Sequence, residues 1–443
     1  MRKVAFSVCS VASVVNAFLS SGFISSAALS RRSQRESPSA TRRGSSWTRC
    51  LAGGDAGRQT TMRTLLLLLF LSPIASTAEV VLPDPLLTNA GTHVMSASDW
   101  PARRAELLEL FRHHVYGRAP VGRPEGMTIT TTGSTAGVMG GAADLRQLHL
   151  GWKGPGGEGG MNVVLFVPSK RDKPVGCFLL ICNRPVENID PTREKKSPFW
   201  PAEQMIARGY AIAAFNNAEI DPDKDDGFKD GVHGVFDAPG RPRADDAWAT
   251  IAAWSWGASR AIDALVEQPG IDPTRIAVVG HSRGGKTALW CGAQDERVAL
   301  TISNDSGCTG AAISRGKQGE RVAKINAAFP HWFTTTYKQW NEREAEMPFD
   351  QHELLALMAP RLLYVASASE DAWADPQAEF RSCIAAAPVW ALFGQSGFTT
   401  TVFPAPESPL QDGRIGYHLR TGKHDLTEYD WMRYADFADR HWK

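Results

Sequence analysis

The chain has 443 residues, with 48 lysines and arginines against 47 aspartates and glutamates, and 43% of its residues are hydrophobic. This ordinary globular composition excludes a disordered, collagen-like or disulfide-stapled protein. Residues 1–78 hold ten basic and only two acidic residues, which leaves a net charge of −7 on residues 79–443. A folded part with that charge is a poor candidate for binding nucleic acid, and we expect no such partner.

The first 78 residues have the composition of a leader and a targeting segment and not that of a folded domain. Residues 1–61 are rich in Ser, Arg and Ala, and we interpret them as a disordered leader or a start codon assigned too far upstream, unless their first apolar stretch is itself a targeting segment. Residues 62–78 combine a basic flank, a short leucine run and small residues, which predicts a signal peptide cleaved after Ala78. The run is too short to span a bilayer. We therefore expect a secreted or periplasmic protein, not held at a membrane, with one domain over residues 79–443.

Five cysteines follow the predicted cleavage site: Cys177, Cys182, Cys291, Cys308 and Cys383. A chain of this length buries a sizeable core without staples, so we expect at most one or two disulfides and a leftover thiol. The sequence has no CxxC pair and no HExxH, which argues against a structural zinc site or a zinc protease.

The next elements are a helix and two paired strands. Asp99–Tyr116 has a helical period, with Asp99 as N-cap and Gly117 as the stop. Leu145–Trp152 alternates like a strand, and Met161–Val167 is its expected partner.

From there, short apolar strands alternate with helices. The expected strands are 177–182, 210–215, 275–279, 298–303 and 361–367, and the expected helices between them include 201–208 and 247–267. Strands that are apolar throughout, with helices between them, predict a mainly parallel sheet covered on both faces. The fold class is therefore α/β, a three-layer sandwich. Trp254, Trp256 and Trp290 lie on predicted helices and are expected to be packing residues.

A candidate nucleophile lies directly after the strand 275–279. Gly280-His281-Ser282-Arg283-Gly284 matches G-x-S-x-G between a strand and a helix, a turn in which glycines let the chain bend sharply and expose the serine hydroxyl. We predict Ser282 as the nucleophile, against the alternative of a structural turn serine. Arg283 then supplies the backbone N–H of an oxyanion hole, and its guanidinium can add positive charge there. This serine chemistry needs no metal and no cofactor.

A serine nucleophile needs a base, and the base needs a third group to orient it. In hydrolases of this topology the acid and then the histidine follow the serine. Of the histidines near the C-terminus we choose His424, on a glycine-led loop before the last helix, and we expect His418 and His441 at the surface. The acid is Asp371 or Asp305, each of which follows a late strand, and the sequence does not choose between them.

Four motifs in this order resemble the glucuronoyl esterases of carbohydrate esterase family 15, especially its bacterial branch. They are Gly280–Lys286, Ser303–Gly310, Ser367–Pro376 and Gly422–Trp431, and the likeness extends over nearly all of residues 79–443. The resemblance implies an α/β-hydrolase that cleaves the ester between a lignin alcohol and the carboxyl of (4-O-methyl-)glucuronic acid on xylan. This lignin–carbohydrate ester is the expected partner of a monomeric enzyme.

The resemblance also implies roles for single residues. It implies Ser282 as nucleophile, His424 as base and Arg283 as a side-chain contributor to the oxyanion hole, with the acid taken from Asp305, Asp371 or both. Lys286, Glu320 and Trp373 match the positions that hold the uronate ring.

Reasoning from the residues themselves supports two of these three positions. Lys286 is four residues after Ser282, so on a helix it shares that face, and Trp373 is two residues past Asp371. Only the resemblance supports Glu320.

One departure from the family concerns a disulfide. Fungal members carry bridged cysteines beside the serine and beside the histidine, whereas His281 and Asp425 occupy those positions here. Cys308 and Cys383 are the only candidates that we consider for a pair elsewhere.

Two other functions stay open at this point. The same residues could serve an acetyl- or feruloyl-xylan esterase or a peptidase of this fold. A catalytically silent carbohydrate-binding protein is the alternative from another class, although the complete set of serine, histidine and carboxylates disfavours it.

Overall fold

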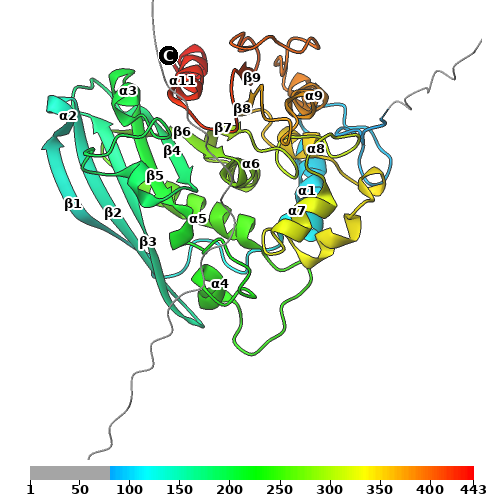
Figure 1. Ribbon diagram of the computed structural model, residues 1–443, viewed down its shortest axis with the longest axis horizontal. Helices are drawn as coiled ribbons and strands as arrows, with labels where there is room; N and C mark the ends of the chain where they lie inside the picture. The colour runs from blue at the N-terminus through cyan, green and yellow to red at the C-terminus, as the bar shows by residue number, and fades with distance from the viewer. Residues whose placement is uncertain (1–79) are drawn as a thin grey trace, which may run out of the picture. The chain divides into compact units, whose positions relative to one another are not determined.

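The computed structural model describes residues 80–443, so the predictions for residues 1–78 lie outside it. A nine-stranded sheet runs through the described part, in the order β1-β2-β3-β5-β4-β6-β7-β8-β9 (Figure 1). The strands are β1 (Thr128–Gly137), β2 (Ala143–Gly154), β3 (Gly157–Pro168), β4 (Val175–Cys182), β5 (Ala211–Asn216), β6 (Ile271–His281), β7 (Val298–Asn304), β8 (Leu362–Ala368) and β9 (Ile415–Arg420). β1, β2, β3 and β5 pair antiparallel in turn, and the strands from β5 through β9 are parallel.

Helices connect most of the parallel strands. They are α1 (Trp100–Phe111), α2 (Val138–Gly141), α3 (Ala202–Ala207), α4 (Gly231–Phe236), α5 (Thr250–Leu265), α6 (Arg283–Gln294), α7 (Val322–Ala328), α8 (Gln351–Ala356), α9 (Pro376–Ala386), α10 (Pro388–Ala391) and α11 (Glu428–Trp442). Within residues 80–443, no helix has the length and apolar character that crossing a membrane requires.

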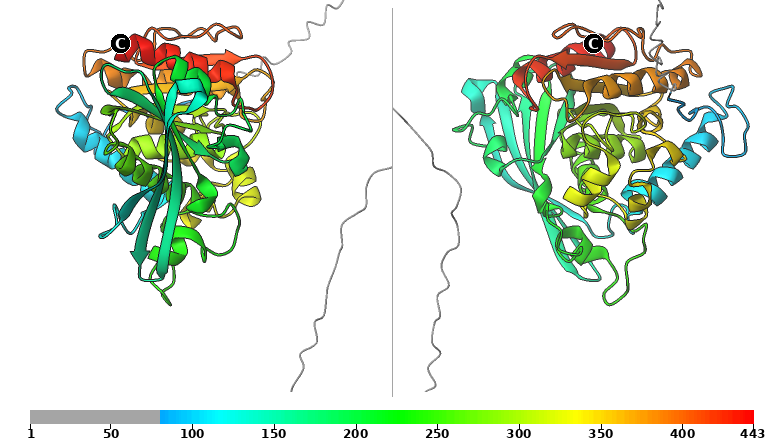
Figure 2. Two further views of the ribbon diagram at one scale, coloured as in Figure 1. Left: turned by 90° about the vertical axis from the view of Figure 1, so that its left-hand side faces the viewer. Right: turned by 45° about the vertical axis from the view of Figure 1, so that its right-hand side comes forward.

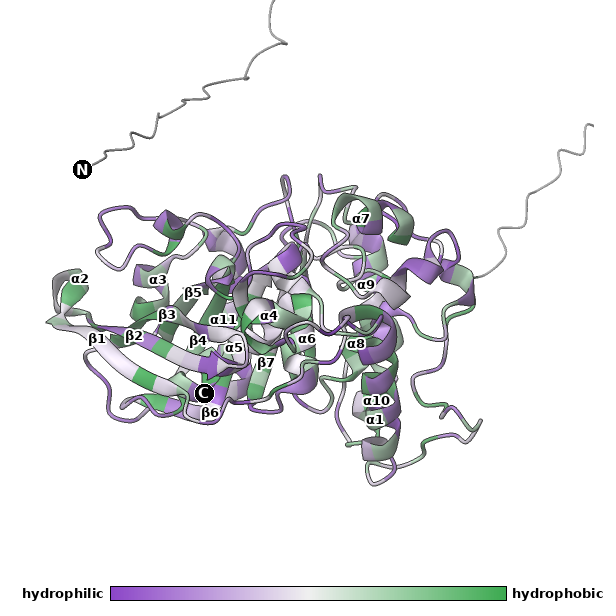
Figure 3. Cartoon of the chain, turned by 90° about the horizontal axis from the view of Figure 1, so that it is seen from below, coloured by the Kyte–Doolittle hydropathy of each residue, from purple (hydrophilic) through white to green (hydrophobic). Residues whose placement is uncertain are grey.

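The central strands bury side chains on both faces of the sheet. In β6, Val278 joins the hydrophobic cluster that also contains α5 and α6, whereas Val279 joins the cluster that contains α3 and α11. The same alternation holds in β4 for Leu179 and Leu180. Helices therefore cover both faces (Figures 1 and 2), and the central strands are more hydrophobic than the edge strand β1 (Figure 3). This is the predicted three-layer α/β sandwich.

The predicted elements are present with small shifts of their ends. The helix predicted over Asp99–Tyr116 is α1 followed by a π-helical turn, Arg112–Tyr116, and it stops at Gly117, whose φ of 90° suits glycine. Asp99 is at the N-cap, but its side chain makes no cap hydrogen bond. The predicted packing tryptophans Trp254, Trp256 and Trp290 are buried.

The sequence patterns miss both edge strands. β1 is mostly exposed and consists of Thr, Gly, Ser and Ala with one Ile, so it lacks the hydrophobic alternation of a half-buried strand. β9 is buried throughout, but it contains His418 and Arg420 and so does not read as an apolar run.

The four parallel strands β6, β7, β8 and β9 bring the loops that follow them to the same end of the sheet. Gly280 of β6 pairs with Ser303 of β7, Ser303 with Val365 of β8, and Val365 with Tyr417 of β9. The segments that follow these strands therefore lie next to one another at the carboxyl ends, where open α/β sheets bind their ligands.

Candidate active site

Ser282 lies in a strained turn between β6 and α6. Its φ of 57° and ψ of −122° form a conformation that a non-glycine residue rarely adopts. Its backbone N–H donates to the carbonyl of Asn304 at 2.9 Å. The turn also needs glycine at position 280, because a Cβ there would lie 1.9 Å from the carbonyl oxygen of Gly284. This geometry is typical of a nucleophile elbow.

The residues of this turn also fit the phosphate-binding pattern G-x-x-x-x-G-K-[ST], over Gly280–Thr287. Such a site needs a glycine-rich loop whose backbone N–H groups surround phosphate ahead of a helix. Here α6 already begins at Arg283, so Gly284 and Gly285 lie in its first turn. The sequence therefore fits the phosphate-binding pattern, but the chain does not form the glycine-rich loop that phosphate binding needs.

His424 is oriented by Asp371. Its Nδ1 donates to Asp371 Oδ2 at 2.6 Å, which leaves Nε2 to accept a proton. The Asp371 carboxylate also accepts from the backbone N–H of Ala374 at 3.2 Å. Burial acts to raise the pKa of Asp371, but the hydrogen bond and charge of His424 outweigh it and hold that pKa below its ordinary value. Asp371 is therefore suited to stay ionised beside the imidazole.

Asp305 lies in the same cluster but makes different contacts. One oxygen of Asp305, one of Asp371 and one ring nitrogen of His424 lie within 4.8 Å of one another. Asp305 Oδ2 accepts from the backbone N–H of Asp425 at 3.3 Å and lies 3.8 Å from Arg420 Nη2. Its Oδ1 has no hydrogen-bond partner among residues 80–443. Both predicted acids thus reach the histidine region, and the hydrogen bond goes to Asp371.

The protonation of Asp305 separates the two acids further. Burial, followed by the charges of Glu379, Asp430 and Asp371, raises its pKa well above the ordinary value. Two carboxylates and an imidazole at this spacing could in principle hold a metal ion. In the metal-free protein, the raised pKa means that Asp305 holds a proton more readily than Asp371 does.

His281 places the base beside the elbow. Its ring centroid lies 4.5 Å from that of His424, and it is the residue directly before Ser282. Its Nδ1 donates to Asn304 Oδ1 at 2.6 Å. Burial, and then the charge of His424, lower the pKa of His281 to about 3. His281 therefore stays neutral at ordinary pH and serves as a packing neighbour of the base.

Arg283 and Lys286 project from the first turns of α6 toward Trp332. Arg283 Nε forms an ion pair with Asp223 Oδ2 at 2.8 Å, and its guanidinium carbon lies 5.9 Å from the Trp332 ring centroid. Lys286 Nζ lies 6.0 Å from the same ring, and the ammonium donates to the carbonyl of Ser306. Burial lowers the pKa of Lys286, and the charge of Glu320 opposes that shift.

Glu320 and Trp373 lie on two loops that are tied together. The backbone N–H of Glu320 donates to the carbonyl of Trp373 at 3.0 Å, and Lys317 Nζ donates to the carbonyls of Trp373 and Ala374 at 3.1 and 2.8 Å. The Trp373 side chain is 50% exposed, so its ring is accessible to a ligand. Glu320 and Trp373 are therefore neighbours through the backbone, and the charge of Glu320 acts on Lys286.

One prediction from the sequence, the surface position of His418, is wrong. His418 is not at the surface: it is fully buried in β9, where its ring bonds to the Tyr364 hydroxyl and to Asp430 at 3.1 and 2.8 Å. His441 is half-buried on α11. All five cysteines of the described residues are free and buried, so Cys308 and Cys383 do not pair, and the expectation of at most one or two disulfides is not contradicted. The core buries them as small apolar groups.

Several residues around the site carried no signal in the sequence. Arg420 Nη2 donates to the carbonyls of Lys423 and Asp425, on either side of the base, at 2.9 Å each. Asp425, at one of the positions where fungal members have cysteine, forms an ion pair with Arg184 at 2.6 Å.

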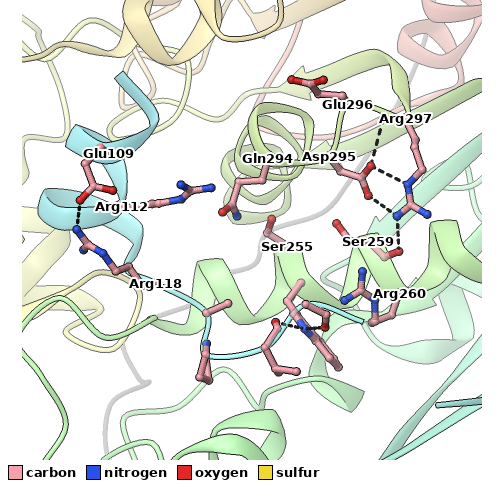
Figure 4. A pocket seen from close by; sticks show the side chains of 15 residues that line it. Glu109, Arg112, Arg118, Ser255, Ser259, Arg260, Gln294, Asp295, Glu296 and Arg297 are labelled. Atoms are coloured by element: carbon pink, nitrogen blue, oxygen red, sulfur yellow. Dashed lines mark hydrogen bonds and ion pairs between the residues drawn. The ribbon is translucent and has the colours of Figure 1, made fainter. Parts of the chain in front are cut away.

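A large hollow lies away from this cluster, at the other end of α6. It has a volume of about 760 Å³ and is lined by parts of α1, α5 and residues 294–297 (Figure 4). Its carboxylates are engaged in ion pairs, for example Asp295 with Arg297 at 2.7 Å. It contains neither the strained serine nor the His424 pair, so we do not assign the reaction to it.

The chain is similar to known proteins over most of its length. Residues 199–394 match the family model described as glucuronyl esterase, fungi. A 4-O-methyl-glucuronoyl methylesterase from Phanerochaete carnosa is 30% identical over 322 residues, which cover 71% of this chain and 72% of that enzyme.

Two solved structures are similar over most of the chain. A glucuronoyl esterase from Solibacter usitatus has a TM-score of 0.77 at 37% identity and covers 83% of this chain and 100% of its own. A promiscuous CE15 esterase from a marine bacterial metagenome has a TM-score of 0.75 at 37% identity and covers 83% of this chain and 98% of its own. The chain therefore belongs to the glucuronoyl esterases of carbohydrate esterase family 15 and is a carboxylic ester hydrolase with the α/β-hydrolase fold.

Proposed function

We propose that the protein hydrolyses the ester between (4-O-methyl-)glucuronic acid of xylan and a lignin alcohol through an acyl-enzyme on Ser282. The observation that carries this proposal is the His424–Asp371 hydrogen bond of 2.6 Å beside the strained turn of Ser282. The names of the similar proteins, a glucuronoyl esterase and a 4-O-methyl-glucuronoyl methylesterase, support the acyl group.

The reaction begins with attack of the serine on the ester carbonyl. His424 Nε2 takes the hydroxyl proton of Ser282 as Oγ bonds to the carbonyl carbon, and Asp371 stabilises the imidazolium that forms. The carbonyl oxygen becomes negative and is stabilised by the backbone N–H and the guanidinium of Arg283. His424 then gives the proton to the departing alcohol, and water repeats the sequence to release the uronic acid and free Ser282.

Lys286, Glu320 and Trp373 would select the acidic sugar. The ammonium of Lys286 lies one helical turn past the nucleophile and suits the hydroxyl or carboxyl oxygens of a uronate. Trp373 offers an exposed ring face for the sugar, and Glu320 can accept from its hydroxyls.

The test compares two substrates in two variants. We expect the wild type to prefer benzyl glucuronate to p-nitrophenyl acetate, Ser282→Ala to lose turnover of both, and Lys286→Met to lose turnover of benzyl glucuronate selectively. Glucuronate-ester turnover that survives in Ser282→Ala would overturn the acyl-enzyme. An equal loss on both substrates in Lys286→Met would overturn its role in selecting the sugar.

A broader esterase is the second candidate, because one similar structure is described as promiscuous. A wild type that hydrolyses acetyl or feruloyl esters as fast as benzyl glucuronate would favour it. Binding of glucuronoxylan without any ester turnover would favour the silent binding protein.

We also propose export through the signal peptide at residues 62–78, which lie outside the described residues. N-terminal sequencing of secreted material should begin near Glu79, and a start upstream of Met62 would contradict this proposal.

A further inference from the structure

Arg283 depends on its neighbours for its direction. Its side chain is 32% exposed, so nothing in its own burial fixes the guanidinium. The ion pair with Asp223 is made by Nε, at 2.8 Å. Nη2 makes a long contact of 3.4 Å to the carbonyl of Asn183. Because Asp223 engages the inner nitrogen and the Asn183 carbonyl engages Nη2, the other outer nitrogen, Nη1, is the one left to face a developing oxyanion.

Asp223 is itself held from a separate part of the chain. Its Oδ1 accepts from the Trp332 indole N–H at 2.7 Å and from His331 Nε2 at 2.9 Å. Trp332 is buried and stacks on Phe329 with 3.7 Å between ring centroids and 3° between ring planes. One carboxylate oxygen is thus fixed to a packed segment, while the other faces Arg283.

The segment that holds Asp223 is anchored to the start of α5. The backbone N–H of Thr250 donates to the carbonyl of His331 at 3.0 Å, and the N–H of Ile251 donates to that of Trp332 at 3.4 Å. Both residues of α5 are buried. The position of Asp223 therefore follows from the core and not from the exposed loop on which it lies.

The charge state of Asp223 fits a lasting ion pair. Burial acts to raise its pKa, but the hydrogen bonds from His331 and Trp332 and the charge of Arg283 outweigh it and hold that pKa below its ordinary value. Asp223 is therefore suited to stay ionised beside Arg283.

We propose that Asp223, held by His331 and Trp332, is a positioning residue that aims the Arg283 guanidinium at the oxyanion. This inference rests on the proposed function, because it assigns Asp223 a part in the same acyl transfer. Asp223 acts on the reaction only through Arg283, and this dependence distinguishes it from a residue that merely supports the fold.

The test is a double-mutant cycle with benzyl glucuronate as substrate. Asp223→Asn keeps the shape of the side chain and removes its charge. We expect kcat to fall about 10- to 100-fold, with KM changed less than about threefold. This loss of kcat is smaller than the ~10²–10³-fold loss that is typical of a deleted oxyanion donor. In the Arg283→Ala background, Asp223→Asn should lower kcat by less than about twofold.

Three further variants complete the design. Asp223→Glu, which keeps the charge, should recover part of the lost kcat. Trp332→Phe keeps the ring and removes the indole N–H, and we expect a kcat between those of the wild type and Asp223→Asn. Asp225→Asn is the matched control, because it makes the same change two residues along the same loop, and it should leave kcat unchanged.

The outcomes separate this inference from the proposed function. An equal loss of kcat from Asp223→Asn with and without Arg283 would overturn the positioning role, as would a near-normal kcat in the single variant. If instead Ser282→Ala keeps wild-type turnover, the acyl-enzyme itself fails. Melting temperatures within about 2 °C of the wild type for each variant would confirm that the kinetic losses do not come from unfolding.

Discussion

The two ends of α6 are both lined with charged side chains, yet they differ in how those charges are satisfied. At the C-terminal end, Arg297 pairs with Asp295 at 2.7 Å (Figure 4). Arg297 also pairs with Asp263 at 2.7 Å, and Glu296 pairs with Arg104 at 2.9 Å. These contacts form an ordinary network of ion pairs around an open hollow.

The N-terminal end keeps its groups in unusual states. Ser282 is held in a strained conformation, Asp305 is buried with one oxygen unpartnered among the described residues, and Lys286 is buried with a lowered pKa. Groups with shifted pKa values occur at both ends, Asp295 among them, so those shifts alone do not distinguish the two ends. What distinguishes them is the strained turn of Ser282 beside the His424–Asp371 hydrogen bond, and this is why we place the proposed chemistry there and not in the larger hollow.

The largest expected effect on kcat concerns the two acids, Asp371 and Asp305. Asp371→Asn removes the charge that orients His424 and stabilises its imidazolium, so we expect kcat to fall by about 10⁴-fold. Asp305→Asn replaces a carboxyl with a raised pKa by a neutral group of the same shape, and kcat should stay within about tenfold. Steady-state kinetics on benzyl glucuronate measures both.

The double variant Asp305→Asn/Asp371→Asn decides whether one acid can replace the other. If only Asp371 serves, the double variant is no worse than Asp371→Asn alone. A kcat far below that of Asp371→Asn would mean that Asp305 takes over when Asp371 is missing.

The next effect concerns the oxyanion hole. Arg283→Ala removes the guanidinium and keeps the backbone N–H, so kcat should fall by ~10²–10³-fold while the melting temperature changes little. A near-normal kcat would remove the Arg283 side chain from the mechanism. Arg297→Ala, the same substitution just past the other end of α6, is the control for the loss of an ion-paired arginine.

Much of this architecture could be predicted from the sequence. Buried parallel strands appear as unbroken apolar runs, and a sharp turn before a helix leaves a local G-x-S-x-G signature, so β4 to β8 and Ser282 were found. His424 and its two possible acids followed from the chain order of this fold.

The rest depends on contacts between distant residues. Asp223 meets Arg283 and Trp332 only in three dimensions, 60 and 109 residues along the chain, and nothing local marks it. The burial of His418 was missed for the same reason, because its partner Asp430 is what makes an imidazole acceptable in the core. Which of Asp305 and Asp371 bonds to the His424 side chain is seen only from the hydrogen-bond geometry.

The pH dependence of stability gives a smaller effect at the N-terminal end of α6. The pKa of His281 is lowered from 6.5 to about 3 in the folded protein, so the unfolded chain binds this proton first as pH falls. The contribution of neutral His281 to the free energy of unfolding is complete above about pH 6.5. As the pH falls from there to 3, this contribution is lost, and the free energy of unfolding decreases by up to about 1.4 kcal/mol per pH unit.

Replacing His281 by a residue that does not titrate should make the free energy of unfolding depend less on pH. His281→Gln keeps a donor for Asn304, and its free energy of unfolding, measured with denaturant from pH 6.5 to pH 4, should fall less steeply than that of the wild type. His93→Gln, which changes an exposed histidine, should leave the slope unchanged. Parallel curves for wild type and His281→Gln would contradict the buried neutral state of His281.

The smallest effect belongs to the C-terminal end of α6. Arg297→Ala breaks ion pairs whose arginine is 39% exposed, so screening by solvent limits the loss in unfolding free energy to about 0.5–1 kcal/mol, and kcat should stay within about twofold. Lys286→Met, 11 residues earlier in the chain and within α6, should show the opposite balance, with a large loss of glucuronate-ester turnover. If Arg297→Ala lowered kcat tenfold at unchanged stability, the two ends of α6 would be coupled, and the division between a structural end and a reactive end would be wrong.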